Sequence, residues 1–366
     1  MDKRFQNLRR LRAFIKKELQ FKEHVPLLKR MALLRRGFFS EAHVIYDFKK
    51  YGYDAFLTDW QRLSTRKING SFALFLDDKI VFEKVFGRSF PVPQNLCLLD
   101  RGRVYPLESS RRVDSLSAIM DYVKEVNSLV LKPLRGGGGH GIIFLKHKGN
   151  LFTVNGEKNN PRLLLEGILE EKASYLATDF IAQGAFASSL YPRTINTLRI
   201  VTMLDPDTGK AFIPSTVQRI GTKSSEPTDN CELGGLSVHV DPETGELGEG
   251  VVHPRGKGLT WMQHHPDTKE RFTGRKIPDW EAMVSIIFKT AEAHPYLPYV
   301  GWDIVLGDKG FHVIEGNSYT GVDLLQVHKP FSLTPGSGGF MRRTGLSGMF
   351  NFSILSFYKK LFFMYF

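Results

Sequence analysis

A strand-like run that carries one lysine and leads into a cluster of glycines constrains this chain of 366 residues more than any other feature. The run is Leu129–Pro133, and Lys132 is its only charged residue. Glycine has no Cβ, so a glycine loop can bring its backbone N–H groups close to phosphate oxygens. The sequence therefore predicts a phosphate-binding loop with Lys132 as its cation. The glycines are Gly136, Gly137, Gly138, Gly139 and Gly141.

The segment after the glycines decides which kind of phosphate loop this can be. P-loops and dinucleotide-binding loops both run directly into a helix. Here Ile142–Lys146 follows, and its apolar character predicts a second strand. We therefore expect a flap between two strands that covers a nucleotide. The alternative for a glycine cluster is a hairpin tip that binds no ligand.

A second constellation of polar residues lies in the last fifth of the chain. Two predicted strands, 300–305 and 311–317, are separated by a turn and should form a hairpin. Glu315 and Asn317 are two residues apart and point the same way, and Asp303 can lie opposite them. Oxygen ligands without His or Cys suit Mg²⁺, whose shell nucleotide phosphates and water usually complete. The alternative is a solvated strand face.

Further motifs occur in a fixed order between residues 40 and 330. They are Ile68-Asn69, Asp78-Lys79, TINTLR at 194–199, Asp229-Asn230, His265-Pro266-Asp267-Thr268, GWDI at 301–304 and IEGN at 314–317. In this order they resemble the ATP-grasp superfamily, and within it the sugar-transfer-associated family, which is related to α-L-glutamate ligases and encoded with surface-polysaccharide genes. The resemblance implies an α+β ATP-grasp fold, in which two α+β lobes sandwich ATP. It also implies ATP and Mg²⁺ as cofactors, with Mn²⁺ as an alternative metal.

With this resemblance the chain divides into three parts. Residues 1–75 are expected to be a basic, mainly helical N-terminal extension, and 331–366 a hydrophobic and basic tail. Between them, 76–330 would form the ATP-grasp core, with lobe one at about 76–175 and lobe two at about 176–330. Within the core, periodicity and start signals predict helices at 115–126 and 280–293.

The resemblance also implies which residues meet the nucleotide and the substrates. A strand at 174–181 would run between the lobes, and its acidic residue would take the ribose hydroxyls. The cofactor-binding candidates on this strand are Thr178, Asp179 and Phe180, and Lys79 is a further candidate on a helix that opens the core. A polar loop would close over the reacting groups. Its candidate residues are Asp229, Asn230, Gly234 and Gly235.

Phosphoryl and acyl transfer both need positive charge near the γ-phosphate. Some relatives carry an arginine two residues before the metal-binding aspartate, but Gly301 stands there in this chain. We therefore assign the role to Arg199, with Arg219 in reserve and Asn196 as a further catalytic candidate. A structural salt bridge is the alternative role for both arginines, and for Arg219 it is the preferred one.

The net charge of +12 is concentrated at the N-terminus. Residues 1–36 contain twelve Lys/Arg and three acids, a net +9, which leaves +3 for the rest of the chain. In this segment apolar residues recur at helical spacing and predict a basic amphipathic helix. Such a helix either docks on its own protein or lies on an anionic membrane surface. The apolar positions are Phe5, Leu8, Leu11, Ile15 and Leu19.

The remaining signals concern location. The segment Met349–Phe366 is apolar but interrupted by lysines, which suits a helix packed on the body, or an interfacial helix, better than a membrane span. Cys97 and Cys231 are far apart and are interpreted as ordinary core or loop residues in a reducing compartment. With no secretory signal visible, we expect a cytoplasmic protein, with the inner face of the membrane as an alternative. His265 is interpreted as a turn or cap residue.

Together these signals predict an ATP-dependent ligase that forms a C–N bond. Its partners would be a small-molecule carboxylate and an amine or amino acid. The resemblance alone implies that the carboxylate is an acidic sugar and that the reaction belongs to surface-polysaccharide biosynthesis. One alternative is an ATP-grasp kinase that phosphorylates a small molecule or sugar. The other is a basic protein without catalysis that binds a membrane surface or nucleic acid. Nucleic acid is disfavoured because the body of the chain carries little net charge.

Overall fold

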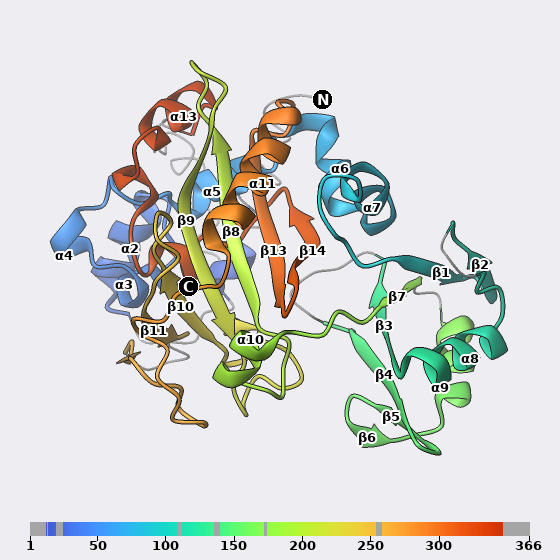
Figure 1. Ribbon diagram of the computed structural model, residues 1–366. Coiled ribbons are helices and arrows are strands. Elements are labelled where there is room, and N and C mark those ends of the chain that lie inside the picture. Colours follow the sequence, from blue (N-terminus) through green and yellow to red (C-terminus); the bar gives the residue numbers. More distant parts are fainter. Residues whose placement is uncertain are drawn as a thin grey trace.

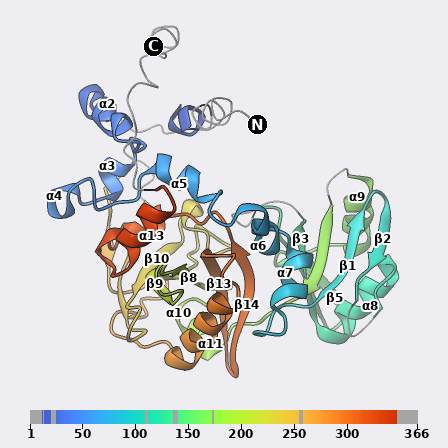
Figure 2. The ribbon, with the colours of Figure 1, turned by 90° about the horizontal axis from the view of Figure 1, so that it is seen from above.

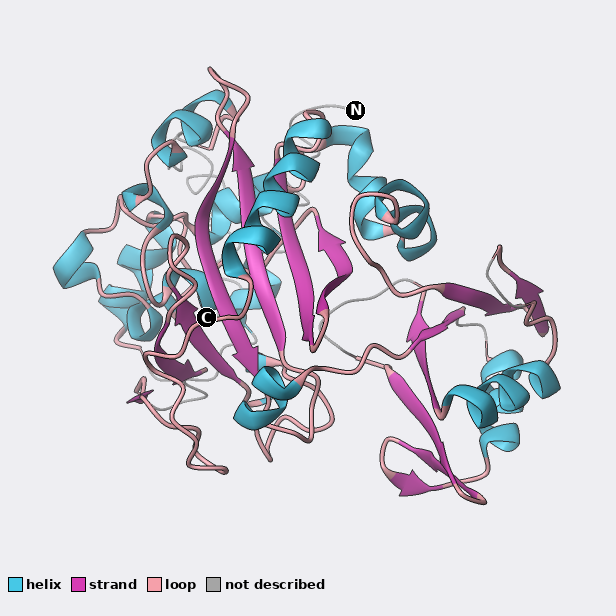
Figure 3. Ribbon diagram, viewed as in Figure 1, coloured by secondary structure: helices cyan, strands magenta, loops and turns pink. Residues whose placement is uncertain are grey.

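The computed structural model describes residues 12, 14–19, 25–108, 112–134, 140–171, 174–253 and 258–346. The predictions for Phe5, Leu8 and Leu11, for Gly136, Gly137, Gly138 and Gly139, and for the segment Met349–Phe366 lie outside these residues. In the described part the chain forms two seven-stranded sheets in which every pairing is antiparallel. Helices accompany both sheets (Figure 3), so the predicted α+β class is confirmed.

The smaller sheet has the order β2-β1-β7-β3-β4-β5-β6. Helix α8 (Leu116–Val126) begins after Ser115, whose side chain accepts a hydrogen bond from the Ala118 N–H. It packs beside α9 (Pro161–Glu170) on this sheet (Figure 1). Their apolar faces and the sheet enclose a separate core, which defines this sheet as the smaller lobe. The strands are β1 (Asn95–Asp100), β2 (Arg103–Pro106), β3 (Ser128–Pro133), β4 (Ile143–Lys148), β5 (Leu151–Val154), β6 (Glu157–Lys158) and β7 (Tyr175–Asp179).

The larger sheet has the order β12-β11-β10-β9-β8-β13-β14. Helix α11 (Trp280–Ala293) crosses one face of its central strands, with the bounds that the sequence predicted (Figure 1). The other face packs against segments that follow the last strand and against the N-terminal helices. The strands are β8 (Thr197–Leu204), β9 (Ala211–Ile220), β10 (Leu236–Val240), β11 (Leu247–Val252), β12 (Trp261–Met262), β13 (Tyr299–Gly307) and β14 (Gly310–Asn317).

Short helices form most of the described N-terminal region and the end of the described chain. Phe38, Tyr46 and Phe56 build an aromatic cluster between the N-terminal helices. Asn69 joins this region to the larger sheet, because its side chain donates to the Tyr299 carbonyl (2.6 Å) and accepts from the Tyr299 N–H (3.2 Å). The N-terminal helices are α2 (Leu27–Arg35), α3 (Ala42–Ile45), α4 (Phe48–Tyr51), α5 (Asp59–Thr65), η1 (Gly70–Ala73) and α6 (Leu74–Asp77). The others are α10 (Ala185–Leu190), η2 (Cys231–Leu233), α12 (Asp323–Gln326), η3 (Phe331–Leu333) and α13 (Ser337–Arg343).

The boundary expected at residue 76 needs correction. Helix α7 (Lys79–Phe86) begins with Asp78 as its N-cap and, like α6, packs against β14. Phe82 and Phe86 belong to the core under the larger sheet. In Figure 2, α6 and α7 lie between the two sheets. Because these helices bury their apolar faces against β14, they belong with the larger lobe, and the smaller lobe begins near β1.

None of the described helices is both long enough and apolar enough to span a membrane.

Candidate functional site

A pocket of about 190 Å³ lies between the two sheets. Its walls come from both lobes, because Lys132 lies on β3 of the smaller sheet while Glu315 lies on β14 of the larger one. The lysine and the acidic hairpin that the sequence singled out therefore face a common cavity. The polar residues that line it are Lys79, Lys132, His140, Asp179, Thr197, Arg199, Arg219, Thr228, Asp229, Asn230, Asp303, Glu315 and Asn317.

Strand pairing explains how the polar residues of the larger lobe come together. Asp303 on β13 is paired with Glu315 on β14 on one side and with Arg199 on β8 on the other. Directly paired residues of antiparallel strands project to the same face of the sheet. A guanidinium and two carboxylates thus form a row across three adjacent strands. Strands β13 and β14 form the hairpin that the sequence predicted, with Asp303 opposite Glu315.

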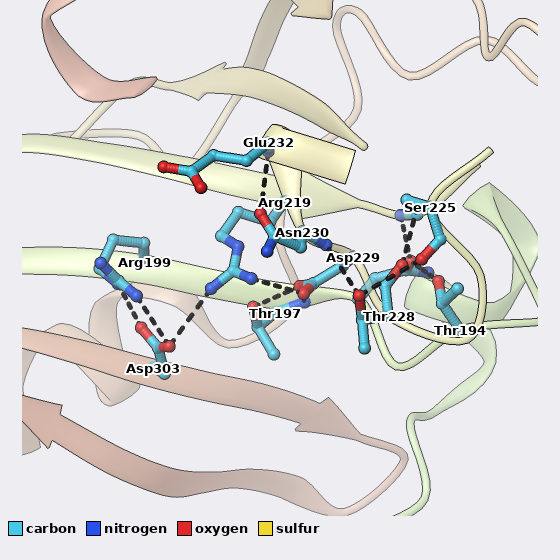
Figure 4. Close-up of polar contacts among 12 residues, drawn as sticks. Thr194, Thr197, Arg199, Arg219, Ser225, Thr228, Asp229, Asn230, Glu232 and Asp303 are labelled. Atoms are coloured by element: carbon cyan, nitrogen blue, oxygen red, sulfur yellow. Dashed lines mark hydrogen bonds and ion pairs between the residues drawn. The ribbon is translucent and has the colours of Figure 1, made fainter. Parts of the chain in front are cut away.

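Asp303 is held by two arginines (Figure 4). Arg199 donates to both of its oxygens, from Nε to Oδ1 and from Nη2 to Oδ2 at 2.8 Å. Arg219 donates from Nη1 to Oδ2 of Asp303 at 3.3 Å and from Nη2 to Oδ1 of Asp229 at 2.6 Å. Asp229 also accepts from the Thr197 N–H at 2.9 Å. The result is a closed network in which every one of these buried charges has an opposite charge beside it.

Buried charges also shift the pKa values in the pocket. Burial raises the pKa of Glu315, and the neighbouring Asp303 carboxylate raises it further. Burial also tends to raise the pKa of Asp303. The positive charges of Arg199 and Arg219 outweigh this effect and hold the pKa of Asp303 below its ordinary value. Burial lowers the pKa of Lys132 to about 8, against the opposing attraction of Glu315. The free pocket therefore favours ionisation of Asp303 over ionisation of Glu315.

The donor set of the hairpin fits a hard divalent cation. Asp303 and Glu315 supply carboxylate oxygens, and Asn317 donates from Nδ2 to the Gly301 carbonyl at 3.3 Å, which leaves its Oδ1 as an acceptor. No group of three or more His, Cys, Asp and Glu side chains among the described residues could hold a metal ion by itself. Two carboxylates and one amide oxygen match Mg²⁺, which takes most of its remaining ligands from phosphate and water.

The smaller lobe contributes an apolar wall to the same pocket. Val130 and Phe144 line it from paired positions on β3 and β4, and Phe180 follows β7. Phe144 and Phe180 meet edge to face with ring centroids 6.1 Å apart, and the Lys146 ammonium lies 4.9 Å from the Phe180 centroid. Tyr122 on α8 donates a hydrogen bond to Asp179. Flat apolar groups and one oriented carboxylate form a suitable slot for a purine and its ribose.

Several predicted site residues lie elsewhere. Asn196 is fully buried and does not line the pocket; its amide donates to the carbonyls of Ala187 and Tyr191 and accepts from the Gly221 N–H. Thr178 points to the opposite side of β7 from Asp179 and donates to the Asp179 carbonyl. It does not line the main pocket.

The two glycines of the candidate substrate loop are required by the shape of its backbone. The positive φ of Gly234, 106°, ends η2, and a Cβ on Gly235 would lie 2.5 Å from the Asp229 carbonyl oxygen. Both glycines thus shape the turn that presents Asp229 and Asn230 to the pocket. In the flap, Gly141 is described and has a φ of 72°.

The structure confirms the turn role of His265 and the burial of both cysteines. Nδ1 of His265 accepts from the N–H groups of Asp267 and Thr268 at 3.2 Å each, so the imidazole caps a turn. Cys97 and Cys231 are both buried, and burial raises the pKa of each thiol to about 12.

Sequence reasoning missed three residues of the site. Tyr122 lies among the apolar positions of an amphipathic helix, where a tyrosine is usually a core residue, so the sequence offers no reason to assign it to the site. Thr197 lies inside the TINTLR motif, which could have drawn attention to it. Thr320 follows the IEGN motif and accepts from Arg199 Nη1 at 2.6 Å. Only the tertiary contacts assign these three to the site.

Comparison with protein families gives a match over residues 61–337 to the family described as sugar-transfer associated ATP-grasp. No relative with a curated description matches the sequence.

Three solved structures illustrate the structural similarity, all at low identity. D-cycloserine synthetase DcsG is 12% identical, with 74% of this chain and 71% of that chain covered and a TM-score of 0.38. D-alanine–D-alanine ligase from Bacillus anthracis is 12% identical, with 75% and 70% covered and a TM-score of 0.37. The ADP complex of N5-carboxyaminoimidazole ribonucleotide synthetase is 9% identical, with 68% and 46% covered and a TM-score of 0.36, so this chain spans less than half of that protein.

Proposed function

The chain belongs to the sugar-transfer associated ATP-grasp family, and we propose that it is an ATP-dependent ligase that joins a carboxylate to an amine through an acyl phosphate. One observation carries the proposal: a single cavity between two lobes collects Lys132, two arginines and the Asp303–Glu315 pair. Cations and paired carboxylates in one enclosed site suit the transfer of a charged phosphoryl group, which depends mainly on positioning and charge neutralisation.

The nucleotide would bind against the smaller lobe. The purine would lie along Val130, Phe144 and Phe180, and Asp179, oriented by Tyr122, would accept from the ribose hydroxyls. Lys132 would pair with phosphate oxygens at the mouth of the glycine flap. Lys79 lines the same cavity and would add a second cation to the phosphate site. The low dielectric of the buried pocket strengthens each of these contacts.

The metal site would be Asp303, Glu315 and Asn317. When bound, Mg²⁺, or Mn²⁺ as the alternative, neutralises the β- and γ-phosphate oxygens. A bound cation would lower the raised pKa of Glu315, since it attracts the ionised carboxylate. Arg199 holds both oxygens of Asp303 in the free protein. It is therefore placed to share that carboxylate or to turn toward the γ-phosphate.

The reaction would have two steps. A carboxylate oxygen of the first substrate attacks the γ-phosphorus, the bond to the ADP oxygen breaks, and an acyl phosphate forms. The amine then adds to the acyl carbon, phosphate leaves, and the nitrogen loses a proton to give the amide. Arg199 and Arg219 would stabilise the negative charge that develops in both steps. The loop at Asp229 and Asn230 would cover the acceptor side of the pocket.

The family description, sugar-transfer associated ATP-grasp, supports a sugar as one substrate. We propose that the carboxylate belongs to an acidic sugar and the amine to an amino acid or a simple amine, in the synthesis of a surface polysaccharide. Such a reaction would draw on cytoplasmic ATP. The clustered cations of the pocket suit an anionic first substrate beside the nucleotide.

The reaction class can be tested without knowing the natural substrates. We would incubate the protein with MgATP, a panel of uronic acids and hydroxylamine, which traps an acyl phosphate as a hydroxamate. We expect hydroxamate, ADP and inorganic phosphate in equal amounts. Lys132→Gln should lose this activity, whereas Lys148→Gln, an exposed lysine at the end of β4, should retain it.

A kinase would give a different result. It would leave the phosphoryl group on a single acceptor, with ADP but without inorganic phosphate or hydroxamate. That outcome would overturn the ligase assignment while preserving the nucleotide site.

A further inference from the structure

The described N-terminal helical residues dock on the protein through a face that neighbours the apolar positions Ile15 and Leu19. Phe14 is buried and packs against Phe39 with ring centroids 4.6 Å apart. Glu18 is also buried and accepts from the Ser40 N–H at 2.9 Å and from Arg30 Nε at 2.7 Å. The segment is thus fixed to the body through Phe14 and Glu18, while Ile15 and Leu19, the two described apolar positions of the amphipathic pattern, are exposed.

Four large apolar side chains are consequently exposed at one end of the molecule. Ile15 is 38% exposed, Leu19 55%, Leu27 64% and Leu28 83%. Helix α2, which carries Leu27 and Leu28, is tied to the N-terminal helical residues by the Glu18–Arg30 ion pair. Figure 2 shows α2 and the N-terminal helical segment on the same side, beyond α5 and away from the smaller lobe. We call Ile15, Leu19, Leu27 and Leu28 the apolar end.

Positive charge surrounds the apolar end. The described residues up to Arg36 contain seven Lys/Arg and one acid, and that acid, Glu18, is buried and paired with Arg30. Arg12 and Lys16, on the same helical segment as Ile15, are exposed. The surface therefore combines leucine and isoleucine side chains with an excess of cations, which is the composition of helices that lie in a membrane interface.

Charge distinguishes between the partners that could cover the apolar end. A second copy of the chain would bring the same net +9 from residues 1–36 against itself. Residues 347–366 of this chain contain two lysines and no acid, so they would add to the positive charge instead of neutralising it. Nucleic acid would match the charge but would leave the four apolar side chains in water. An anionic lipid surface satisfies both the charge and the apolar groups.

We propose that the apolar end docks the protein on the surface of a membrane that contains anionic phospholipids. Ile15, Leu19, Leu27 and Leu28 enter the interface between headgroups and acyl chains, and Arg12 and Lys16 contact lipid phosphates. The nucleotide pocket is formed by other elements and is not part of the docking surface. The inference therefore goes beyond the ligase proposal and does not depend on it.

A probe on the apolar end tests this directly. In the full chain, Leu28→Cys would be labelled with a polarity-sensitive fluorophore. Cys97 and Cys231 are buried with pKa values raised to about 12, so they should not compete for the label. We expect the emission of a water-exposed probe in buffer, and a blue shift on addition of phosphatidylcholine vesicles that contain phosphatidylglycerol. Pure phosphatidylcholine vesicles should give a much smaller shift, and added salt should reverse the shift.

Variants give the matching control. Leu27→Ser/Leu28→Ser should weaken co-sedimentation with the anionic vesicles by about tenfold or more, because two leucines no longer enter the interface. Leu151→Ser/Leu163→Ser removes two similarly exposed leucines from the smaller lobe and should leave binding unchanged. Nucleotide binding measured on every variant verifies the fold.

Three results would overturn the proposal. The first is an apolar emission already present in buffer, which would mean that the chain itself or a second copy covers this surface. The second is the absence of a shift with anionic vesicles. The third is equal binding to neutral and anionic vesicles.

Discussion

At the residue scale, Asp303 and Glu315 are neighbours with opposite electrostatic surroundings. Asp303 neutralises two buried arginines, which hold its pKa low. Glu315 carries a raised pKa because it is buried beside that carboxylate. Two acids one strand apart therefore have different effects on stability. Asp303 is the carboxylate that pairs with Arg199 and the second partner of Arg219, which also pairs with Asp229, whereas an ionised Glu315 costs free energy until a cation arrives.

Asparagine and glutamine substitutions should separate these two effects. Asp303→Asn should lower the free energy of unfolding by about 3–5 kcal/mol, because it removes the carboxylate that pairs with the buried Arg199 and one of the two carboxylates that pair with Arg219. Glu315→Gln should leave the metal-free protein as stable as the parent or more stable. Both variants should lose magnesium-dependent turnover. Thermal unfolding without metal and ATP turnover with metal are the two measurements. Equal destabilisation by both variants would contradict this account.

Lys132 should make nucleotide affinity depend on pH. Burial lowers its pKa to about 8 in the free protein, and bound phosphate would raise it again. Nucleotide binding is therefore accompanied by uptake of a proton when the pH is above the pKa of Lys132 in the free protein. The affinity for ATP should fall as pH rises through about 8, by up to about tenfold per pH unit. Titration calorimetry from about pH 7 to about pH 9 measures this. Lys132→Gln should bind weakly at every pH and flatten the profile; an unchanged slope would be evidence against the role of Lys132.

At the scale of single elements, strand β13 makes room for Arg199 and Thr320 because Gly301 has no side chain. A Cβ on Gly301 would lie 2.7 Å from the Thr320 Oγ1 and 3.6 Å from the Arg199 Cδ. Thr320 can therefore lie directly over the strand and accept a hydrogen bond from Arg199. Arg199 reaches the pocket from β8, and the absence of a side chain on Gly301 leaves room for Thr320 to accept from it.

Filling that space should disturb the site more than the strand. Gly301→Ala should destabilise the protein by about 1–3 kcal/mol through overpacking and should displace Thr320 and Arg199. We expect kcat to fall with the fold retained by circular dichroism. Gly307→Ala is the control on the same strand, because its Cβ would come no closer than 3.4 Å to the Gly310 carbonyl oxygen. Comparable losses of activity in both variants would rule out the steric explanation.

At the scale of the whole molecule, each lobe has its own apolar core. The core of the smaller lobe contains residues between Leu96 and Ala177 only, and the larger sheet, α6, α7 and α11 share another. The pocket between the lobes is lined mainly by charged and apolar side chains that would meet through a ligand. Separate cores make the lobes separate cooperative units, and a nucleotide that contacts both would couple them.

Nucleotide should therefore raise the stability of both lobes together. Without ligand, hydrogen exchange should show the smaller lobe opening independently of the larger sheet. At a MgADP concentration 100 times its Kd, binding should add about 2.7 kcal/mol to the stability of any state that must release nucleotide in order to open. Amides of β3 and of β13 should both become slower to exchange. Protection confined to one lobe would mean that the nucleotide does not bridge the pocket.

Local patterns in the sequence determined the elements and much of the candidate site. The Ser115 cap with the apolar period behind it specified α8, and the alternation around Asp303 and Glu315 specified a hairpin with two acids on one face. Within each of these elements, the residues that form the signal lie within about ten positions of one another. Local hydrogen bonding and periodicity are therefore enough to predict the element from the sequence. The lysine before the glycines was likewise recognisable in the sequence, and the structure places Lys132 in the pocket.

Only the tertiary structure decided the contacts between distant segments. It paired β8 with β13, which put Arg199 on Asp303, and brought Tyr122 to Asp179. It moved α7 to the larger lobe and buried Asn196 away from the pocket. It also turned Ile15 and Leu19 outward, because Phe14 and Glu18 found partners on the body. Strand order and the choice between two usable helix faces depend on which partners lie nearby in space, and a local pattern holds no information about them.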